Sequence, residues 1–194
     1  MLLLMGDFRL IRLIRLLGFI VPLLFLFTAG CASHQPLNED QTVRKIEALS
    51  RDLLKLHHGI DHSAAQQVAA VAVEYTNQLA DRYRISGSPR QHNLLVNLGI
   101  RERGLCFHWT DDLLEKLQEM DAKQFDFHSA VAFKNSDLRE HSSVVVTFKG
   151  APFASGIVLD GWRHSGNLYW SRVRSDRYDW SPRYSKSSAK PVAR

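Results

Sequence analysis

Hydrophobic and polar residues follow two different periods along the chain, and the change of period divides it into two parts. Between residues 40 and 120, apolar residues recur every three or four positions, the spacing of helices with one buried face. From residue 124 onward the apolar runs alternate with polar residues or are rich in valine, as strands are. Helices followed by a run of strands predict an α+β fold with an antiparallel sheet.

Turn-forming residues separate the predicted elements. Gly59 and the SGSP segment at 86–89 interrupt the helical pattern, and KGAPFASG and RHSGN interrupt the strand pattern. Helices are predicted at residues 40–58, 61–85, 90–99 and 105–120. Strands are predicted at residues 124–133, 141–148, 156–160 and 168–173.

The N-terminal segment has the order of an export signal. A positive stretch, RLIRLIR at 9–15, precedes a short apolar stretch, LLGFIVPLLFLF at 16–27. The apolar stretch is shorter than the roughly 18 residues that a spanning helix needs, and Gly18 and Pro22 weaken a permanent helix. The alternative to cleavage is an anchor that stays uncleaved.

The junction TAGC, ending at Cys31, resembles a bacterial lipobox, in which a diacylglycerol is attached to the cysteine after cleavage. The resemblance implies a signal peptide at 1–30 and a lipidated tether at 31–39. The lipid would hold the protein on a membrane without spanning it. Since Ala32 rather than aspartate follows the cysteine, the resemblance implies the outer membrane, with the protein facing the periplasm of a bacterial envelope.

Composition and charge exclude some functions. The net charge of +5 is mild and scattered, so no nucleic-acid partner is expected. The histidine-rich HHGIDH at 57–62 resembles a metal site only in composition and spans a predicted helix break, so it is interpreted as a solvated helix end. Neither a metal nor another cofactor is expected. Residues 181–194 are polar and predicted to form a disordered tail.

Cys106 stands at the predicted start of a helix, where the helix dipole favours a thiolate. His141 begins one predicted strand and Asp160 ends the next, so a hairpin between those strands would make the two neighbours. A nearby base and its orienting acceptor would complete the activation of the thiol.

Other interpretations of Cys106 and its base remain open. The cysteine is alternatively a buried core residue or the partner of Cys31 in a disulfide. His108 and His128 compete with His141 as the base, although residues two apart on a helix, such as Cys106 and His108, do not face each other.

The segments RGLCFHWTDDLL, EHSSVVVTF and GIVLDGW together resemble the core of the transglutaminase-like branch of the papain-like cysteine enzymes. The apolar spacing gives a helical segment at 40–99, and the resemblance implies an enzyme core at 100–180, with the cysteine-bearing helix packed on an antiparallel sheet. It also implies that Cys106 is the nucleophile, His141 the general base and acid, and Asp160 the residue that orients the histidine.

Further site residues are expected around this triad. The oxyanion of the tetrahedral intermediate would be bound by the backbone N–H of Cys106 together with Asn97 or Gln91. Trp109, Trp162 and Trp170 are candidates for a substrate groove, although aromatic residues at such spacing are often core residues.

Two classes of function follow. The first is a lipid-anchored cysteine peptidase or acyl transferase that acts, through a thioester, on a peptide or on peptidoglycan peptide. The second is a catalytically inactive lipoprotein that binds or braces another envelope protein.

Overall fold

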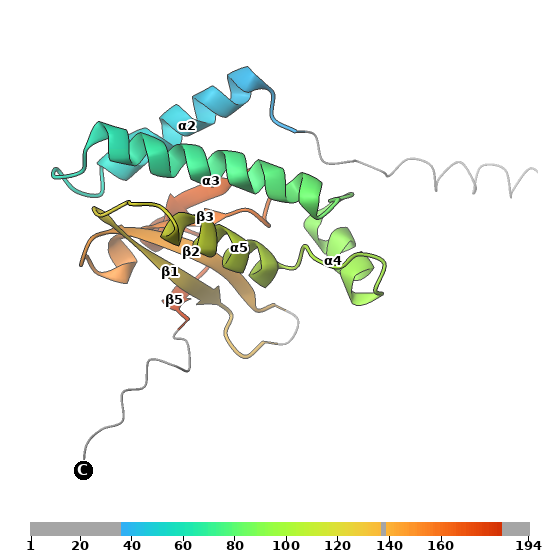
Figure 1. Ribbon diagram of the computed structural model, residues 1–194. Helices are drawn as coiled ribbons and strands as arrows, with labels where there is room; N and C mark the ends of the chain where they lie inside the picture. The colour runs from blue at the N-terminus through green and yellow to red at the C-terminus, as the bar shows by residue number, and fades with distance from the viewer. Residues whose placement is uncertain (1–35, 137–138, 184–194) are drawn as a thin grey trace, which may run out of the picture. The chain divides into compact units, whose positions relative to one another are not determined.

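Residues 36–136 and 139–183 are described by the computed structural model, and they contain four α-helices followed by one five-stranded antiparallel sheet (Figure 1). The predicted α+β class is therefore confirmed. The chain divides into residues 1–33 and 34–194, and all described residues belong to the second unit. The predicted signal peptide at 1–30, the lipidation site Cys31 and residues 184–194 of the predicted tail lie outside the described residues.

The helices begin at capping residues that the sequence supplies. Asn38 and Ser88 each accept an N–H three residues later, from Gln41 and from Gln91, and both glutamines bond back to the N–H of the capping residue. The helices are α2 (Glu39–Leu54), α3 (His62–Arg82), α4 (Pro89–Asn97) and α5 (Cys106–Gln118). The helix α2 thus begins at Glu39, the last residue of the predicted tether.

The strands pair only in antiparallel fashion, in the order β4-β3-β2-β1-β5. They are β1 (Phe125–Ala132), β2 (His141–Phe148), β3 (Ile157–Asp160), β4 (Tyr169–Arg172) and β5 (Trp180–Pro182). The short 3-10 helices η1 (Phe153–Ser155) and η2 (Val173–Ser175) lie in connections. The strand pattern did not predict β5, and two of its residues had been assigned to the tail that was expected to begin at residue 181.

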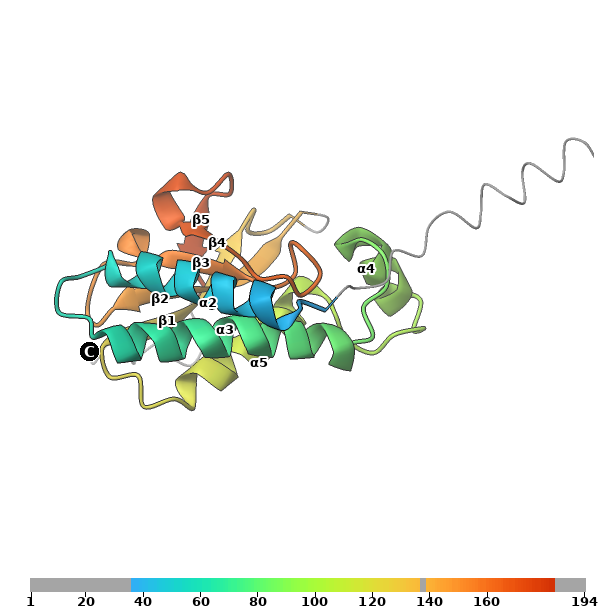
Figure 2. The same cartoon turned by 90° about the horizontal axis from the view of Figure 1, so that it is seen from above.

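The main core lies between the helices and one face of the sheet. The helix α5 contacts β1 and β2, α3 packs against α5, and α2 packs against α3 (Figures 1 and 2). Fully buried residues from the helices, such as Val68 and Leu113, share this core with Val144, Val146 and Leu159 of the sheet. The predicted segments 40–99 and 100–180 therefore share one hydrophobic core.

A smaller cluster covers the other face of the sheet. Val145 and Val158, which alternate with the residues of the main core, pack there with Val173 and Trp180. The helix α4 takes no part in either cluster and stands at the end of α3, beyond the sheet (Figures 1 and 2).

None of the helices in residues 36–136 and 139–183 is long and apolar enough to cross a membrane.

Candidate functional site

The loop before α5 brings the backbone close to α4 and thereby sets where Cys106 begins its helix. Gly104 has a φ of +126°, and a Cβ at this position would lie 2.3 Å from Nε2 of His92. The His92 ring is fully buried, and its Nε2 lies 2.9 Å from the carbonyl oxygen of Arg103. Trp109 Nε1 donates to the carbonyl of Gly104 at 3.0 Å. This close packing, which only glycine permits, fixes Cys106 as the first residue of α5.

The two competing histidines are engaged elsewhere. His108 Nδ1 accepts the N–H groups of Gly104 and Leu105, at 3.1 and 3.2 Å, and so caps the start of α5. His128 Nε2 bonds Thr147 Oγ1 at 3.0 Å, and this histidine does not line the cleft that contains Cys106. Burial lowers the pKa of both rings, with the charge of Arg103 adding to the effect at His108.

His141 and Asp160 meet at the end of the sheet, where the sequence predicted them to be neighbours. The pairing of β2 with β3 sets Val144 opposite Leu159. Continuing that register by one residue sets Asp160 opposite Ser143, which makes His141 its diagonal neighbour on the same face. His141 Nε2 lies 2.7 Å from Asp160 Oδ2, and both side chains are almost fully buried.

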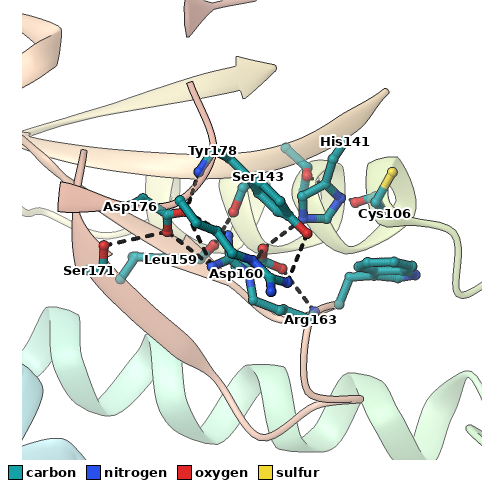
Figure 3. Close-up of polar contacts among 12 residues, drawn as sticks. Cys106, His141, Ser143, Leu159, Asp160, Arg163, Ser171, Asp176 and Tyr178 are labelled. Atoms are coloured by element: carbon teal, nitrogen blue, oxygen red, sulfur yellow. Dashed lines mark hydrogen bonds and ion pairs between the residues drawn. The ribbon is translucent and has the colours of Figure 1, made fainter. Parts of the chain in front are cut away.

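Cys106 lies on the other side of the His141 ring. Figure 3 shows the second ring nitrogen of His141, the one not bound to Asp160, facing Cys106. The sulfur itself is 3.9 Å from the carbonyl oxygen of Glu140, the residue before His141. Cys106 is half-buried and carries a free thiol. The first turn of α5 therefore reaches the end of the sheet at the residue that begins β2.

The surroundings of His141 favour its protonated form. Burial alone would lower the pKa of His141, but the hydrogen bonds to Asp160 and Cys106 and the charges of both groups raise it to about 9. A cation next to a sulfur favours the thiolate, which is the nucleophilic form of cysteine. The protonated imidazole therefore has the Asp160 carboxylate on one side and the Cys106 side chain on the other.

A second buried ion pair lies behind Asp160. Arg163 donates to Asp160 through its backbone N–H and its Nε, each at 3.0 Å (Figure 3). Its Nη1 reaches Asp176 at 3.1 Å, and its guanidinium lies between the rings of Tyr169 and Tyr178, 4.0 and 4.4 Å from their centroids. Arg163 and Asp176 were not among the predicted site residues, because their pairing depends on how the turns after β3 and β4 fold.

These contacts keep Asp160 ionised. Burial alone would raise the pKa of Asp160, but the hydrogen bond from His141 and the charges of His141 and Arg163 hold it below its usual value. A charged acceptor at this position orients the imidazole and stabilises its cation.

Aromatic rings enclose the imidazole. Trp162, Tyr178 and Trp180 have ring centroids 4.8, 5.5 and 5.5 Å from that of His141. Only 5% of His141 is exposed, so the ring is shielded from water on the sides away from Cys106.

Cys106 and His141 line a cleft of about 620 Å³, and Asp160 lies buried behind His141. One wall is a face of α4, and the other comes from the connection between β1 and β2. The lining residues are Arg90, Asn93, Leu94, Asn97, Cys106, Phe133, Arg139, Glu140, His141, Trp162 and Tyr178.

The structure brings one of the three predicted groove tryptophans to the cleft. Trp162 lines the cleft and donates from Nε1 to Asn93 Oδ1 at 3.0 Å. Trp109 is instead buried in the core, and Trp170 packs near α2, where its Nε1 bonds Asp52. Periodicity identifies aromatic residues with a buried face but does not show which of them face a cleft.

The two oxyanion candidates also have different positions. Asn97 lines the cleft, whereas the side-chain oxygen of Gln91 accepts the N–H of Ser88 in the cap of α4, and Gln91 does not line the cleft. The pattern Ser-x-x-Gln at 88–91 is a sequence signature of this cap. The N–H groups of Cys106 and Phe107 lie in the first turn of α5, where a helix offers them no acceptor, and so can bind an anion.

No group of three or more histidine, cysteine, aspartate or glutamate side chains is placed to hold a metal ion within the described ranges. In the HHGIDH segment, the His57 ring stacks on Phe148, with 3.8 Å between centroids, and its Nδ1 accepts the N–H of Gly59.

Comparison of the chain with models of known protein families, with curated proteins and with solved structures found no match. A function can therefore be inferred only from the arrangement of Cys106, His141 and Asp160.

Proposed function

We propose that the protein is a transglutaminase-like cysteine enzyme that cleaves or exchanges an amide through a thioester on Cys106. The observation that carries the proposal is the position of His141, which bonds the buried Asp160 at 2.7 Å through Nε2 and faces Cys106 with its other nitrogen. Nucleophile, base and orienting acid in this order are the parts of an acyl-transfer triad.

In the first half of the reaction, the Cys106 thiolate attacks the acyl carbon of an amide and forms a carbon–sulfur bond. The N–H groups of Cys106 and Phe107 bind the oxyanion of the tetrahedral intermediate. As the carbon–nitrogen bond breaks, protonated His141 gives its proton to the leaving amine.

In the second half, water or an amine attacks the thioester carbon. Neutral His141 takes the proton of this second nucleophile, the carbon–sulfur bond breaks, and the thiolate is regenerated beside imidazolium. Water gives hydrolysis and an amine gives amide exchange, and both use the same three residues.

The proposed setting is the bacterial envelope. The lipobox-like TAGC at Cys31 supports attachment to the outer membrane, with the domain facing the periplasm. The proposed substrate is a peptide, including the peptide part of the cell wall, because such amides are present where the domain would be held.

The test is the rate at which Cys106 reacts with iodoacetamide near neutral pH, followed by intact mass. We expect fast labelling of the wild type, and a rate about a hundredfold lower in His141→Ala, because the variant lacks the cation that favours the thiolate. His128→Ala is the matched control, because this half-buried histidine lies on the same sheet away from the cleft.

Slow labelling of the wild type, with no loss in His141→Ala, would contradict the proposal. That result would favour the second function class, a catalytically inactive accessory lipoprotein. Labelling in Asp160→Asn should be intermediate, because the imidazole keeps its place near the thiol but lacks the charge that stabilises its cation.

A further inference from the structure

The two walls of the cleft each present an arginine that has no carboxylate partner among the described residues. Arg90 lies on α4, and Arg139 lies just before β2. The one acidic side chain that lines the cleft, Glu140, is paired with Arg183 and accepts the N–H of Asn135. Together with the imidazolium of His141, the two guanidinium groups give the cleft an excess of positive charge.

Each arginine has an exposed apolar side chain beside it. On α4, Arg90 and Leu94 are four residues apart and so share a helix face, and Leu94 is 58% exposed. On the other wall, the Arg139 guanidinium lies 5.0 Å from the ring centroid of Phe133, which is 37% exposed. Each wall thus presents one cation and one apolar side chain to any molecule that binds in the cleft.

The face of α4 that lines the cleft also carries two asparagines. Asn93 and Asn97 share that face with Arg90 and Leu94, and all four line the cleft. The Asn93 side chain is held by Trp162, so this wall is fixed to the loop that follows Asp160. A chain lying in the cleft would meet two amide groups and one cation on this wall, and Cys106 lines the same cleft.

We propose that the cleft selects an acyl donor that is an acidic peptide, with a free carboxylate close to the acyl group that Cys106 attacks. Arg90 and Arg139 bind that carboxylate, since guanidinium groups match carboxylates in charge and geometry. Leu94 and Phe133 cover an apolar part of the same peptide. This inference rests on the proposed role of Cys106 as an acyl-transfer nucleophile.

The test compares two alkylating reagents of nearly equal size, iodoacetate and iodoacetamide. In both reactions a sulfur–carbon bond forms and iodide leaves, but only iodoacetate carries a carboxylate. The measured quantity is the ratio of the two labelling rates at Cys106, because the iodoacetamide rate corrects each variant for the reactivity of its thiolate.

We expect the ratio of iodoacetate to iodoacetamide labelling to fall about threefold in Arg90→Gln or Arg139→Gln, and about tenfold in the double variant. Raising the salt concentration should lower the wild-type ratio towards that of the double variant, because these cations are exposed to solvent. Arg51→Gln is the matched control, because Arg51 is an exposed arginine of α2 that does not line the cleft.

The outcomes separate this inference from the proposed function. An unchanged ratio in the double variant, or an equal fall in Arg51→Gln, overturns the carboxylate site while leaving the nucleophile intact. Slow labelling by both reagents in the wild type, unaffected by His141→Ala, overturns the proposed function itself.

A second measurement uses peptide thioesters as acyl donors. Two donors that differ only in glutamate or glutamine next to the acyl group are compared by the rate at which they acylate Cys106. We expect the glutamate donor to be preferred about tenfold by the wild type, and the preference to disappear in Arg90→Gln/Arg139→Gln. An equal rate for both donors in the wild type would contradict the inference.

Discussion

At the scale of single residues, the site depends on four buried side chains whose charges alternate: His141, Asp160, Arg163 and Asp176. A charge removed from water is costly unless a partner compensates it. Here each carboxylate lies next to a cation, and each hydrogen bond fixes the orientation of the next group. The imidazole that faces Cys106 is therefore held by Asp160, which is held in turn by Arg163 and Asp176 on the side away from the cleft.

The first prediction concerns the effect of pH on stability. The pKa of His141 is raised in the fold to about 9 from an ordinary value of 6.5, so the folded protein holds this proton more tightly than the unfolded chain. The stabilisation is fully present below pH 6.5 and is lost as the pH rises through 9. It amounts to roughly 3 kcal/mol, measurable by urea unfolding across that range.

Asp160→Asn should flatten this decline, because the neutral amide no longer stabilises the cation. His128→Gln is the control and should leave the decline in place, since burial lowers the pKa of His128 and its effect therefore falls below pH 6.5. A wild-type free energy of unfolding that stays constant between pH 6.5 and 9 would contradict the raised pKa of His141 in the folded protein.

The second prediction concerns Arg163. Arg163→Met leaves the buried carboxylates of Asp160 and Asp176 without their shared cation, and should lower the free energy of unfolding by about 3–5 kcal/mol. Arg44→Met removes an exposed pair with Asp40 and should cost less than about 1 kcal/mol. Equal losses in urea unfolding would show that the Arg163 pairs are not a buried network.

At the scale of elements, the site is built where three element ends meet: the start of α5, the start of β2 and the end of β3. The triad residues occupy those ends, so their sequence order and the hairpin of β2 and β3 were enough to predict that His141 and Asp160 are neighbours. The helix α5 packs on the sheet through β1 and β2, as the resemblance implies, but on the face that carries Val144 and Val146. His141 points to the face opposite the helices, and the thiol meets it beyond the end of the sheet.

Elements with a long clear period were predictable, and the short strand and the loops were not. The bounds of α3 and β2 follow from their apolar spacing, whereas β5 is three residues long, contains Pro182 and leads into a polar segment. The strand β5 pairs with β1, and this pairing depends on the edge of β1 in the folded sheet and not on a local sequence pattern. The Arg163–Asp176 pair was missed for the same reason, because it joins two turns that no local pattern relates.

The third prediction tests the junction of α4 and α5. Gly104→Ala places a methyl group against the His92 ring at a φ that L-residues rarely adopt, and should lower the free energy of unfolding by about 3 kcal/mol. Gly99→Ala is the control, because Gly99 also has a positive φ but no atom lies within 4 Å of a Cβ there. It should cost about 1 kcal/mol.

A double-mutant cycle separates the clash from backbone strain. His92→Ala removes the ring, so Gly104→Ala should cost less in that background than in the wild type. Equal costs in the two backgrounds would show that the contact with His92 does not constrain the loop before Cys106.

At the scale of the whole molecule, the two cysteines are proposed to have separate functions. The fourth prediction is that Cys31→Ala abolishes incorporation of labelled palmitate and moves the protein out of the membrane fraction. Cys106→Ala is the matched control and should remain in the membrane fraction with its label. Loss of both properties in Cys106→Ala, or of neither in Cys31→Ala, would contradict lipidation at Cys31.

During synthesis, the groups around His141 can be complete only after the last strand, β5, has been made and has paired with β1. Trp180 packs beside the His141 ring, and Arg183 bonds Glu140, the residue whose carbonyl meets the Cys106 sulfur. The ribosome makes Cys106 first and these supporting groups some seventy residues later. A nascent chain that ends before Asp176 therefore carries Cys106, His141 and Asp160 but lacks the second acid that pairs with Arg163, and the surroundings of His141 are complete only once the C-terminal strand has been made.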